Sequence, residues 1–225
     1  MMSIIENLKL IKQELPQGVK LVAVSKTKPV EAIEEAYKGG QRVFGENKAQ
    51  EMAAKYEQLP KDIEWHFIGH MQTNKVKYIA PFVHLIHSVD SIKVLREINK
   101  QAVKNNRTIN CLLQFHIAEE STKFGLNREE AELLIHSKKD FSNVNLTGVM
   151  GMATFTDDKE RVRREFKQLH NHFIFLKENF FSDDENFKEI SMGMSGDYKI
   201  AIEEGSTIIR VGTKIFGKRN YPATK

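Results

Sequence analysis

Hydrophobic and polar residues follow two alternating patterns along this chain. Short apolar runs are typical of buried strands, and they predict strands over 19–24, 42–45, 63–69, 82–88, 108–117, 144–150, 187–190 and 206–212. Between these runs, apolar residues three and four positions apart predict helices over 4–15, 29–40, 46–59, 73–81, 91–102, 127–138, 162–180 and 195–205. Local signals support the boundaries: Asn127 precedes Glu130 by three positions, as in a capping box, and Gly205 ends its helix.

Each predicted strand except the last is followed by a helix, and this order favours a parallel sheet with helical crossovers. Consecutive units without a break in composition fit a closed (β/α)8 barrel better than an open sheet. Such a barrel takes about 250 residues, so a chain of 225 residues leaves no room for a second domain. The sequence therefore predicts an α/β fold, a single TIM barrel over residues 1–225 with an extra helix at its N-terminus.

Composition narrows the class of protein. The 34 Lys and Arg residues are spread among 30 Asp and Glu residues, so the net charge of +4 forms no dense block and nucleic-acid binding is not expected. No segment approaches the roughly 18 apolar residues of a membrane span, so no membrane partner is expected. The lone Cys111 excludes a disulfide framework and favours a reducing, cytoplasmic location.

Three segments that could bind a ligand or react with it are expected to lie close together in the predicted barrel. Active sites of such barrels lie at the carboxyl ends of the strands, and phosphate groups often bind the loops after strands seven and eight. Lys26 follows the first strand, SMGMSGD (191–197) follows the seventh, and RVGTKIFG (210–217) spans the end of the eighth. Glycines in both loops let the backbone approach a ligand, and the helix starting near Gly196 offers free N–H groups. A phosphate monoester is the expected occupant.

Lys26 is the candidate nucleophile at this mouth. A lysine with a pKa near 10.4 is a neutral amine in only about one molecule in 2,500 at pH 7, and partial burial would raise that fraction. An aldehyde carrying a phosphate describes pyridoxal 5′-phosphate (PLP), and it equally describes the substrate of a sugar-phosphate aldolase. Arg210 would grip a phosphate or face a pyridine nitrogen, which it would leave unprotonated.

Six motifs in this chain resemble one known family. LVAVSKTKP, FGEN, WHFIGHMQTNK, KFGL, SMGMSGDYKIAIEEGST and RVGTKIFGKR are similar to the motifs of pyridoxal phosphate homeostasis proteins, the YggS or PROSC group. That group in turn resembles the N-terminal domain of alanine racemases. The motifs run in order from residue 21 to residue 219. The resemblance implies a barrel of the racemase type with PLP as its cofactor.

The resemblance also implies a set of cofactor-binding residues. Lys26 would hold PLP as an aldimine, and Arg210 would face the pyridine nitrogen. The phosphate would be held, largely through backbone N–H groups, by Ser191, Met194, Ser195, Gly212 and Thr213. Asn47 and Met150 would lie beside the ring. The full set is Lys26, Asn47, Met150, Ser191, Met194, Ser195, Arg210, Gly212 and Thr213. Departures from the family's pattern fall at the rim, at Lys48, Gly196 and Lys214.

Two histidines are expected near the mouth, His66 and His70, at the end of the third strand. Four positions apart they could ligate zinc on a helix, but they straddle a strand end and lack an intervening glutamate. Structural roles are therefore expected for both, and no metal site is predicted.

The resemblance implies a carrier rather than a catalyst. Racemisation needs a proton donor on the ring face opposite the lysine, which alanine racemases take from a second domain of the partner subunit. This chain ends at Lys225, soon after the last predicted strand, and nothing places Tyr221 over the ring. The implied role is PLP homeostasis: a monomer that stores the cofactor, masks its aldehyde and delivers it to PLP-dependent apo-enzymes. The alternative is a PLP-dependent, racemase-like enzyme acting on amino acids.

Overall fold

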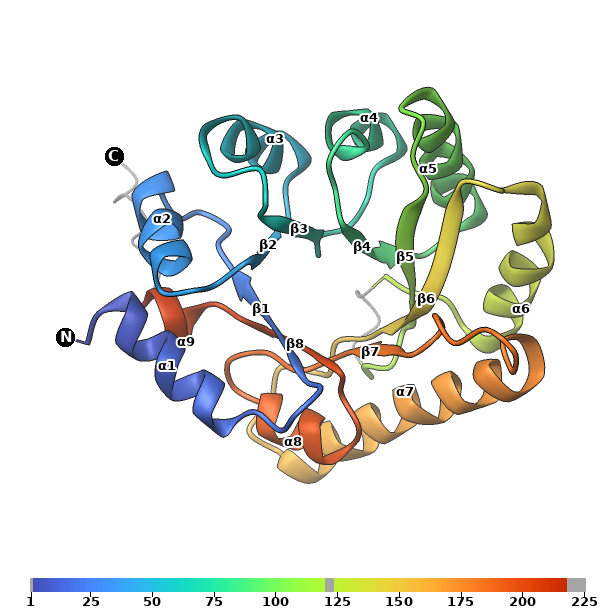
Figure 1. Cartoon of the computed structure of the whole chain (residues 1–225). Helices are drawn as coiled ribbons and strands as arrows, with labels where there is room; N and C mark the ends of the chain where they lie inside the picture. The colour runs from blue at the N-terminus through green and yellow to red at the C-terminus, as the bar shows by residue number, and fades with distance from the viewer. Residues whose placement is uncertain (1, 120–123, 218–225) are drawn as a thin grey trace, which may run out of the picture.

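A closed barrel of parallel strands forms the body of the protein. The computed structural model describes residues 2–119 and 124–217, so Lys123 of KFGL, the last two residues of RVGTKIFGKR, and Tyr221 lie outside it. In the described residues the strands run in the order β1 to β8, each beside its neighbour in sequence, and β8 pairs with β1 to close the ring. Figure 1 shows this ring with the helices around its outside. The predicted TIM barrel is confirmed.

The bounds of the elements follow the sequence prediction closely. The strands are β1 (Lys20–Val24), β2 (Val43–Glu46), β3 (Glu64–Phe67), β4 (Leu85–Val89), β5 (Ile109–Gln114), β6 (Val144–Met150), β7 (Glu189–Ser191) and β8 (Ile208–Val211). The helices are α1 (Ile4–Glu14), α2 (Val30–Lys38), α3 (Ala49–Gln58), α4 (Val76–Ile79), α5 (Ile92–Lys104), α6 (Arg128–Ser137), α7 (Lys159–Phe180), α8 (Tyr198–Glu203) and α9 (Thr213–Phe216). Two differences stand out: the helix predicted over 73–81 begins as a 3₁₀ turn, η1 (Thr73–Lys75), and α9 was not predicted. A second 3₁₀ turn, η2 (Lys138–Asp140), follows α6.

Side-chain caps fix where several helices begin. The predicted capping box at α6 is present, because Asn127 accepts from the N–H of Glu130 while the Glu130 carboxylate accepts from the N–H of Asn127. Ser3 and Glu6 form the same arrangement at α1. The predicted N-terminal helix α1 lies against α2 and α9 outside the barrel (Figure 1).

The interior of the barrel contains more polar groups than a barrel normally holds. A large apolar layer, with Trp65 and Phe44 fully buried, lies between the strands and the helices. The apolar cluster inside the barrel is much smaller and consists of Val22, Leu85, Leu112, Met150 and Ile208. Four buried polar side chains lie on strands β3, β4, β7 and β8, namely His66, His87, Ser191 and Arg210. Branched apolar residues usually fill such an interior, so these polar groups need partners.

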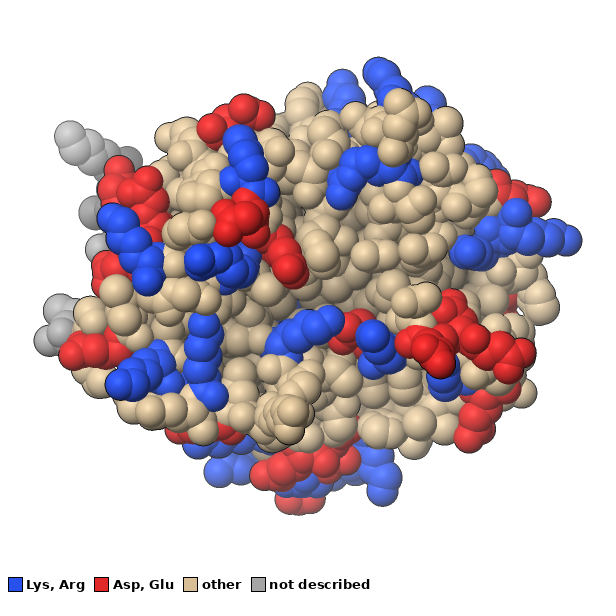
Figure 2. Space-filling view, in the orientation of Figure 1, with Lys and Arg blue, Asp and Glu red and all other residues tan. Residues whose placement is uncertain are grey.

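Charges of both signs are interspersed on the face of the molecule seen in Figure 2. This distribution agrees with the even spread of charge along the sequence. None of the helices in residues 2–119 and 124–217 combines the length and the apolar character that a bilayer crossing requires.

Candidate functional site

A cavity of about 330 Å³ lies where β1, β7 and β8 end. Its size falls within the range of about 300–1,000 Å³ that is typical of small-ligand sites. It is lined by Val24, Lys26, Ile68, Met152, Phe155, Met194, Ser195, Gly196, Asp197, Arg210, Gly212 and Thr213. The three segments that the sequence predicted to converge therefore meet around one cavity.

Lys26 lies in a turn directly after β1, and its side chain is half-buried. The next residue, Thr27, has a φ of 65°, in the left-handed region that β-branched residues rarely adopt. Its N–H donates to Glu51 Oε1 at 2.8 Å, which holds the turn in this conformation. Backbone strain of this kind costs about 1–3 kcal/mol and persists only where surrounding contacts enforce it.

Lys55, on α3, also stabilises the turn that contains Lys26, through hydrogen bonds to residues on both sides of it. Its ammonium group donates to Glu46 Oε1 and Glu51 Oε1 at 2.7 Å each, and to the carbonyl of Ser25 at 2.9 Å. The Ser25 hydroxyl also donates to Glu46 Oε1, at 2.7 Å. Burial raises the pKa of Glu46, and the neighbouring ammonium of Lys55 opposes that rise. Because a buried charge network fixes the residues on both sides of Lys26, the Lys26 backbone is positioned before any ligand binds.

Arg210 supplies a buried positive charge on the opposite wall. Its Nη1 donates to Ser191 Oγ at 2.5 Å and its Nη2 donates to the carbonyl of Gly151 at 3.0 Å. Burial lowers the pKa of Arg210 to about 10, with Asp197 opposing the shift, so the guanidinium remains charged at neutral pH. A guanidinium has five N–H donors, and Arg210 also lines the cavity. Donors beyond these two contacts can therefore serve a ligand.

The loops after β7 and β8 are joined to each other. The N–H of Gly212 donates to Ser195 Oγ at 3.2 Å, and the N–H of Met194 donates to Asp197 Oδ1 at 2.5 Å. Thr213 opens α9, and the first N–H groups of a helix have no partners within it. Backbone donors and two hydroxyl groups are thus concentrated at one end of the cavity, as an anionic group requires.

Comparison with known proteins identifies the family. Residues 1–220 match the family described as "Alanine racemase, N-terminal domain". The pyridoxal phosphate homeostasis protein of Aquifex aeolicus is 42% identical over 203 residues, which cover 90% of this chain and 88% of that protein. This chain belongs to the pyridoxal phosphate homeostasis protein family. The homeostasis protein of Escherichia coli is 35% identical over 210 residues, covering 92% of this chain and 88% of that protein.

Among solved structures, this homeostasis-family chain is similar to PipY of Synechococcus elongatus. PipY without PLP aligns with a TM-score of 0.90 and 34% identity, and PipY with PLP bound aligns with 0.87 and 33%. Both alignments cover 96% of this chain and 100% of PipY. Alanine racemase from Bacillus anthracis has a TM-score of 0.77 at 16% identity, covering 97% of this chain and 56% of the racemase, which indicates a shared fold alone.

Most residues that the sequence assigned to a homeostasis-family site line this cavity. These are Lys26, Met194, Ser195, Arg210, Gly212 and Thr213. Ser191 lies behind the lining and contacts Arg210. Met150 is buried at the end of β6, paired with Ser191 across the ladder, and Asn47 follows β2. Contact of Asn47 and Met150 with a cofactor ring stays a prediction.

Sequence reasoning missed other residues of the cavity wall. Ile68 and Met152 each follow a strand, β3 and β6, and Asp197 lies in the predicted loop after β7. The rule that carboxyl ends of barrel strands face the site could have found all three. Phe155, 95% exposed at the rim, has no comparable signal in the sequence.

The prediction for the two histidines is half wrong. His70 follows β3, and its Nδ1 lies 3.1 Å from Asp90 Oδ2. His66 is buried within β3, bonded to His87, and it lines a different cavity at the amino ends of the strands. The sequence places both residues near a strand end, but the inward orientation of His66 within the strand directs it away from the mouth.

Gly193 and Gly196 provide a matched test of the loop after β7. We expect Gly193→Ala to lower the free energy of unfolding by about 1–3 kcal/mol, because Gly193 has a φ of +94° and a Cβ would lie 2.6 Å from the Cβ of Ala201. Gly196→Ala should change it by less than about 0.5 kcal/mol, because no atom lies within 4 Å of its Cβ position. Urea denaturation measures both values. Equal losses would contradict the close approach at Gly193.

Proposed function

We propose that this protein is a PLP carrier that binds the cofactor in the cavity at the ends of β1, β7 and β8. It stores the cofactor, masks its aldehyde and releases it to PLP-dependent apo-enzymes, without catalytic turnover of its own. The observation that supports this most strongly is that Lys26, Arg210 and the Ser195–Thr213 end line one cavity of about 330 Å³.

The residues present fit PLP at its aldehyde, its phosphate and its pyridine nitrogen. When bound, the cofactor supplies an aldehyde carbon that forms a covalent bond with an amine, with loss of water. Lys26 offers that amine from a fixed turn. Ser195 and Thr213 offer hydroxyl groups to the phosphate, and the start of α9, just after Gly212, offers backbone N–H donors. Arg210 offers a donor to the pyridine nitrogen and keeps its own proton, which leaves the ring a weak electron sink.

The lining of the cavity supports a carrier over a racemase. Among the described lining residues, the ionisable side chains are Lys26, Asp197 and Arg210, with no tyrosine, histidine or cysteine. Asp197 accepts a hydrogen bond from the N–H of Met194 within its own loop. Two-base racemisation needs two groups that exchange a proton with the substrate carbon, one on each face. In the described lining Lys26 could serve as one of them, and no tyrosine, histidine or cysteine is present to serve as the other.

The relatives support the same assignment. The curated relatives are named as homeostasis proteins, and PipY has been solved with PLP bound. We further propose that the protein acts as a monomer. We also propose that it acts in the cytoplasm, in keeping with a single cysteine, Cys111, that is fully buried and whose thiol has its pKa raised by burial.

Titration of the purified protein with PLP tests the proposal. We expect a visible absorbance band that saturates at one PLP per chain, and borohydride should convert it to a stable adduct. Incubation of the loaded protein with L- or D-alanine should leave the enantiomeric composition unchanged over many equivalents. Sustained racemisation or transamination would favour the enzyme alternative, and failure to bind PLP would contradict both.

Thr213→Ala tests the phosphate end separately. We expect about a tenfold or greater loss of PLP affinity, since a hydrogen bond to a charged group is worth about 1.5–3 kcal/mol. The affinity for pyridoxal, which lacks the phosphate, should change little. Thr156→Ala, in the exposed segment before α7, provides the control. An equal loss for PLP and pyridoxal would contradict the placement of the phosphate.

A further inference from the structure

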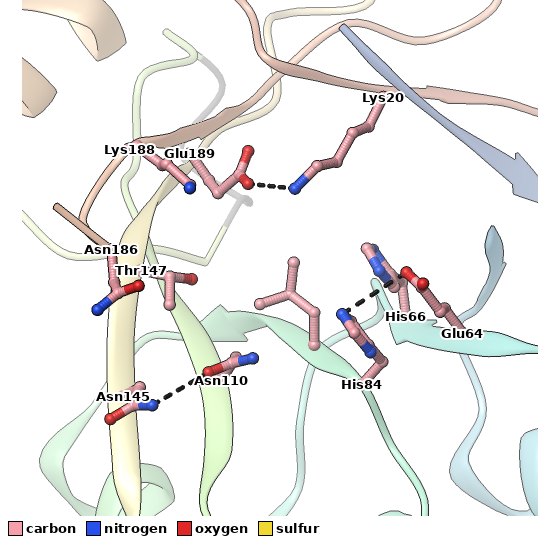
Figure 3. A pocket seen from close by; sticks show the side chains of 11 residues that line it. Lys20, Glu64, His66, His84, Asn110, Asn145, Thr147, Asn186, Lys188 and Glu189 are labelled. Carbon is pink, nitrogen blue, oxygen red and sulfur yellow. Dashed lines mark hydrogen bonds and ion pairs between the residues drawn. The ribbon is translucent and has the colours of Figure 1, made fainter. Parts of the chain in front are cut away.

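A second cavity, of about 250 Å³, is shown in Figure 3. It lies at the amino ends of the strands, at the opposite end of the barrel from Lys26. Its walls come from the first residues of β1, β3, β4, β5, β6 and β7 and from the segments just before them. The proposed carrier function makes no use of this cavity.

Glu64, His66 and His84 gather on one side of it (Figure 3). One ligand atom from each residue lies within 4.8 Å of the other two. Glu64 Oε2 is 3.6 Å from His84 Nε2, and the rings of His66 and His84 are nearly parallel, with centroids 5.6 Å apart. Across the cavity Lys20 is bonded to Glu189, so its ammonium group is directed away from the three residues.

His66 is the buried member of this cluster, and one of its ring nitrogens lacks a hydrogen-bond partner among the described residues. The residue is 2% exposed, and its Nδ1 lies 2.9 Å from His87 Nε2. Its other nitrogen, Nε2, is buried and has no hydrogen-bond partner among the described residues. Because His66 lines the cavity while its Nδ1 is held by His87, Nε2 is the nitrogen left for a ligand. A buried polar atom of this kind is normally satisfied by a partner such as a water molecule or an ion.

The hydrogen-bond geometry of the two buried histidines suits a metal ligand. His87 Nδ1 lies 2.8 Å from Ser191 Oγ, so a tautomer with the proton on Nδ1 of each ring lets His66 donate to His87 and His87 donate to Ser191. His66 Nε2 then carries a lone pair. Metal-bound histidines typically donate their second N–H to a fixed partner in this way.

We propose that Glu64, His66 and His84 bind a divalent transition-metal ion of the zinc class. Two imidazoles and one carboxylate form a known zinc donor set that leaves a coordination position open to water. His66 is fixed, whereas the side chains of Glu64 and His84 are 47% and 49% exposed. These two can rotate to the roughly 2.0–2.2 Å that zinc requires. The cavity has room for the ion and its water.

Hydrogen bonds connect this site to the cofactor cavity. His66 contacts His87, His87 contacts Ser191, and Ser191 accepts from Arg210. A bound ion selects the tautomer in which the proton of each ring lies on Nδ1. The metal site therefore determines which way the hydrogen bonds point along the interior of the barrel.

Equilibrium dialysis of the tag-free full chain against ZnCl₂ tests the proposal. We expect one zinc ion per chain, and His84→Ala and Glu64→Gln should each weaken binding by about tenfold or more. His70→Ala is the matched control, because His70 also pairs with a carboxylate, that of Asp90, but belongs to no group of three possible metal ligands among the described residues. Circular dichroism checks that each variant is folded. Zinc binding equal in the wild type, His84→Ala and Glu64→Gln would overturn the site.

A second measurement does not depend on variants. In ¹⁵N-edited NMR spectra of the histidine rings, zinc should shift His66 Nε2 and leave His66 in the tautomer with its proton on Nδ1. The same result is expected with and without PLP, so failure of the carrier proposal would not affect it. A His66 ring unaffected by saturating zinc would overturn the assignment.

Discussion

Replacing Lys26 by alanine will abolish both the visible absorbance of the PLP-treated protein and the borohydride-trapped adduct. Lys26 is the lysine in the described lining of the cavity, and its backbone is fixed by Glu51 through Thr27. Without its amine the aldehyde carbon has no covalent partner in that lining. Mass spectrometry of peptides from the trapped wild-type protein should locate the adduct on Lys26, with none in the variant.

Lys48→Ala is the control for this experiment. Lys48 is exposed just before α3, beyond the carboxyl end of β2, so its loss should leave the adduct and its yield unchanged. An adduct on Lys28 in the wild-type protein would contradict the assignment. Lys28 lies two residues after Lys26, but its Nζ donates to the carbonyl of Phe216 at 2.9 Å.

Replacing Lys55 by methionine will lower the free energy of unfolding by about 3–5 kcal/mol, the loss expected when one partner of a buried ion pair is removed. The side chain of Lys55 is 7% exposed, and that of Glu46 is fully buried. Glu46 Oε2 already has no hydrogen-bond partner among the described residues. Removal of the ammonium would leave the carboxylate with the Ser25 hydroxyl as its donor. Urea denaturation gives the difference.

The pH dependence of this loss has a defined sign. Burial raises the pKa of folded Glu46, and removal of Lys55 raises it further. Stability from a neutral Glu46 is fully present below its unfolded pKa and is lost as the pH rises through the folded pKa. The cost of Lys55→Met should therefore be smaller in acid than at neutral pH, and Glu46→Gln in the same chain should restore part of the stability.

Lys100→Met is the matched control for Lys55. Lys100 lies 3.9 Å from Glu97 on α5 with its side chain 73% exposed, so its loss should cost less than about 1 kcal/mol. If Lys55→Met cost no more than this control, the network beneath the Lys26 turn would not be the stabilising feature inferred here.

Local sequence patterns were sufficient to predict the fold, because each strand–helix unit of the barrel is formed by residues that are neighbours in the sequence. The alternation of short apolar runs with helical periodicity located every strand, and the caps at Asn127 and Gly205 located helix ends. Among the described residues, the α-helix that was missed, α9, has four residues, too few for a periodic signal. The helix predicted over 73–81 is split into η1, of three residues, and α4, of four. These pieces are also too short for the boundary between them to show in the periodicity.

The candidate cofactor site was also largely predictable, for a topological reason. In a barrel of this kind every strand ends at the same mouth, so the order of elements along the chain already brings Lys26 together with the loops at 191–197 and 210–217. The residues behind the lining were not predictable. Lys55 reaches Ser25 from 30 positions away, and no pattern in either segment indicates that contact.

The sequence by itself determined the barrel, its open end and the lysine at that end, because these depend on periodicity and on the order of the units. Only the tertiary structure decided which polar side chains meet inside. His66 bonds to His87 across 21 positions and His87 to Ser191 across 104, as the register of β3, β4 and β7 dictates. Side-chain direction changes with every residue of a strand, so these contacts depend on a register that the packed barrel alone fixes.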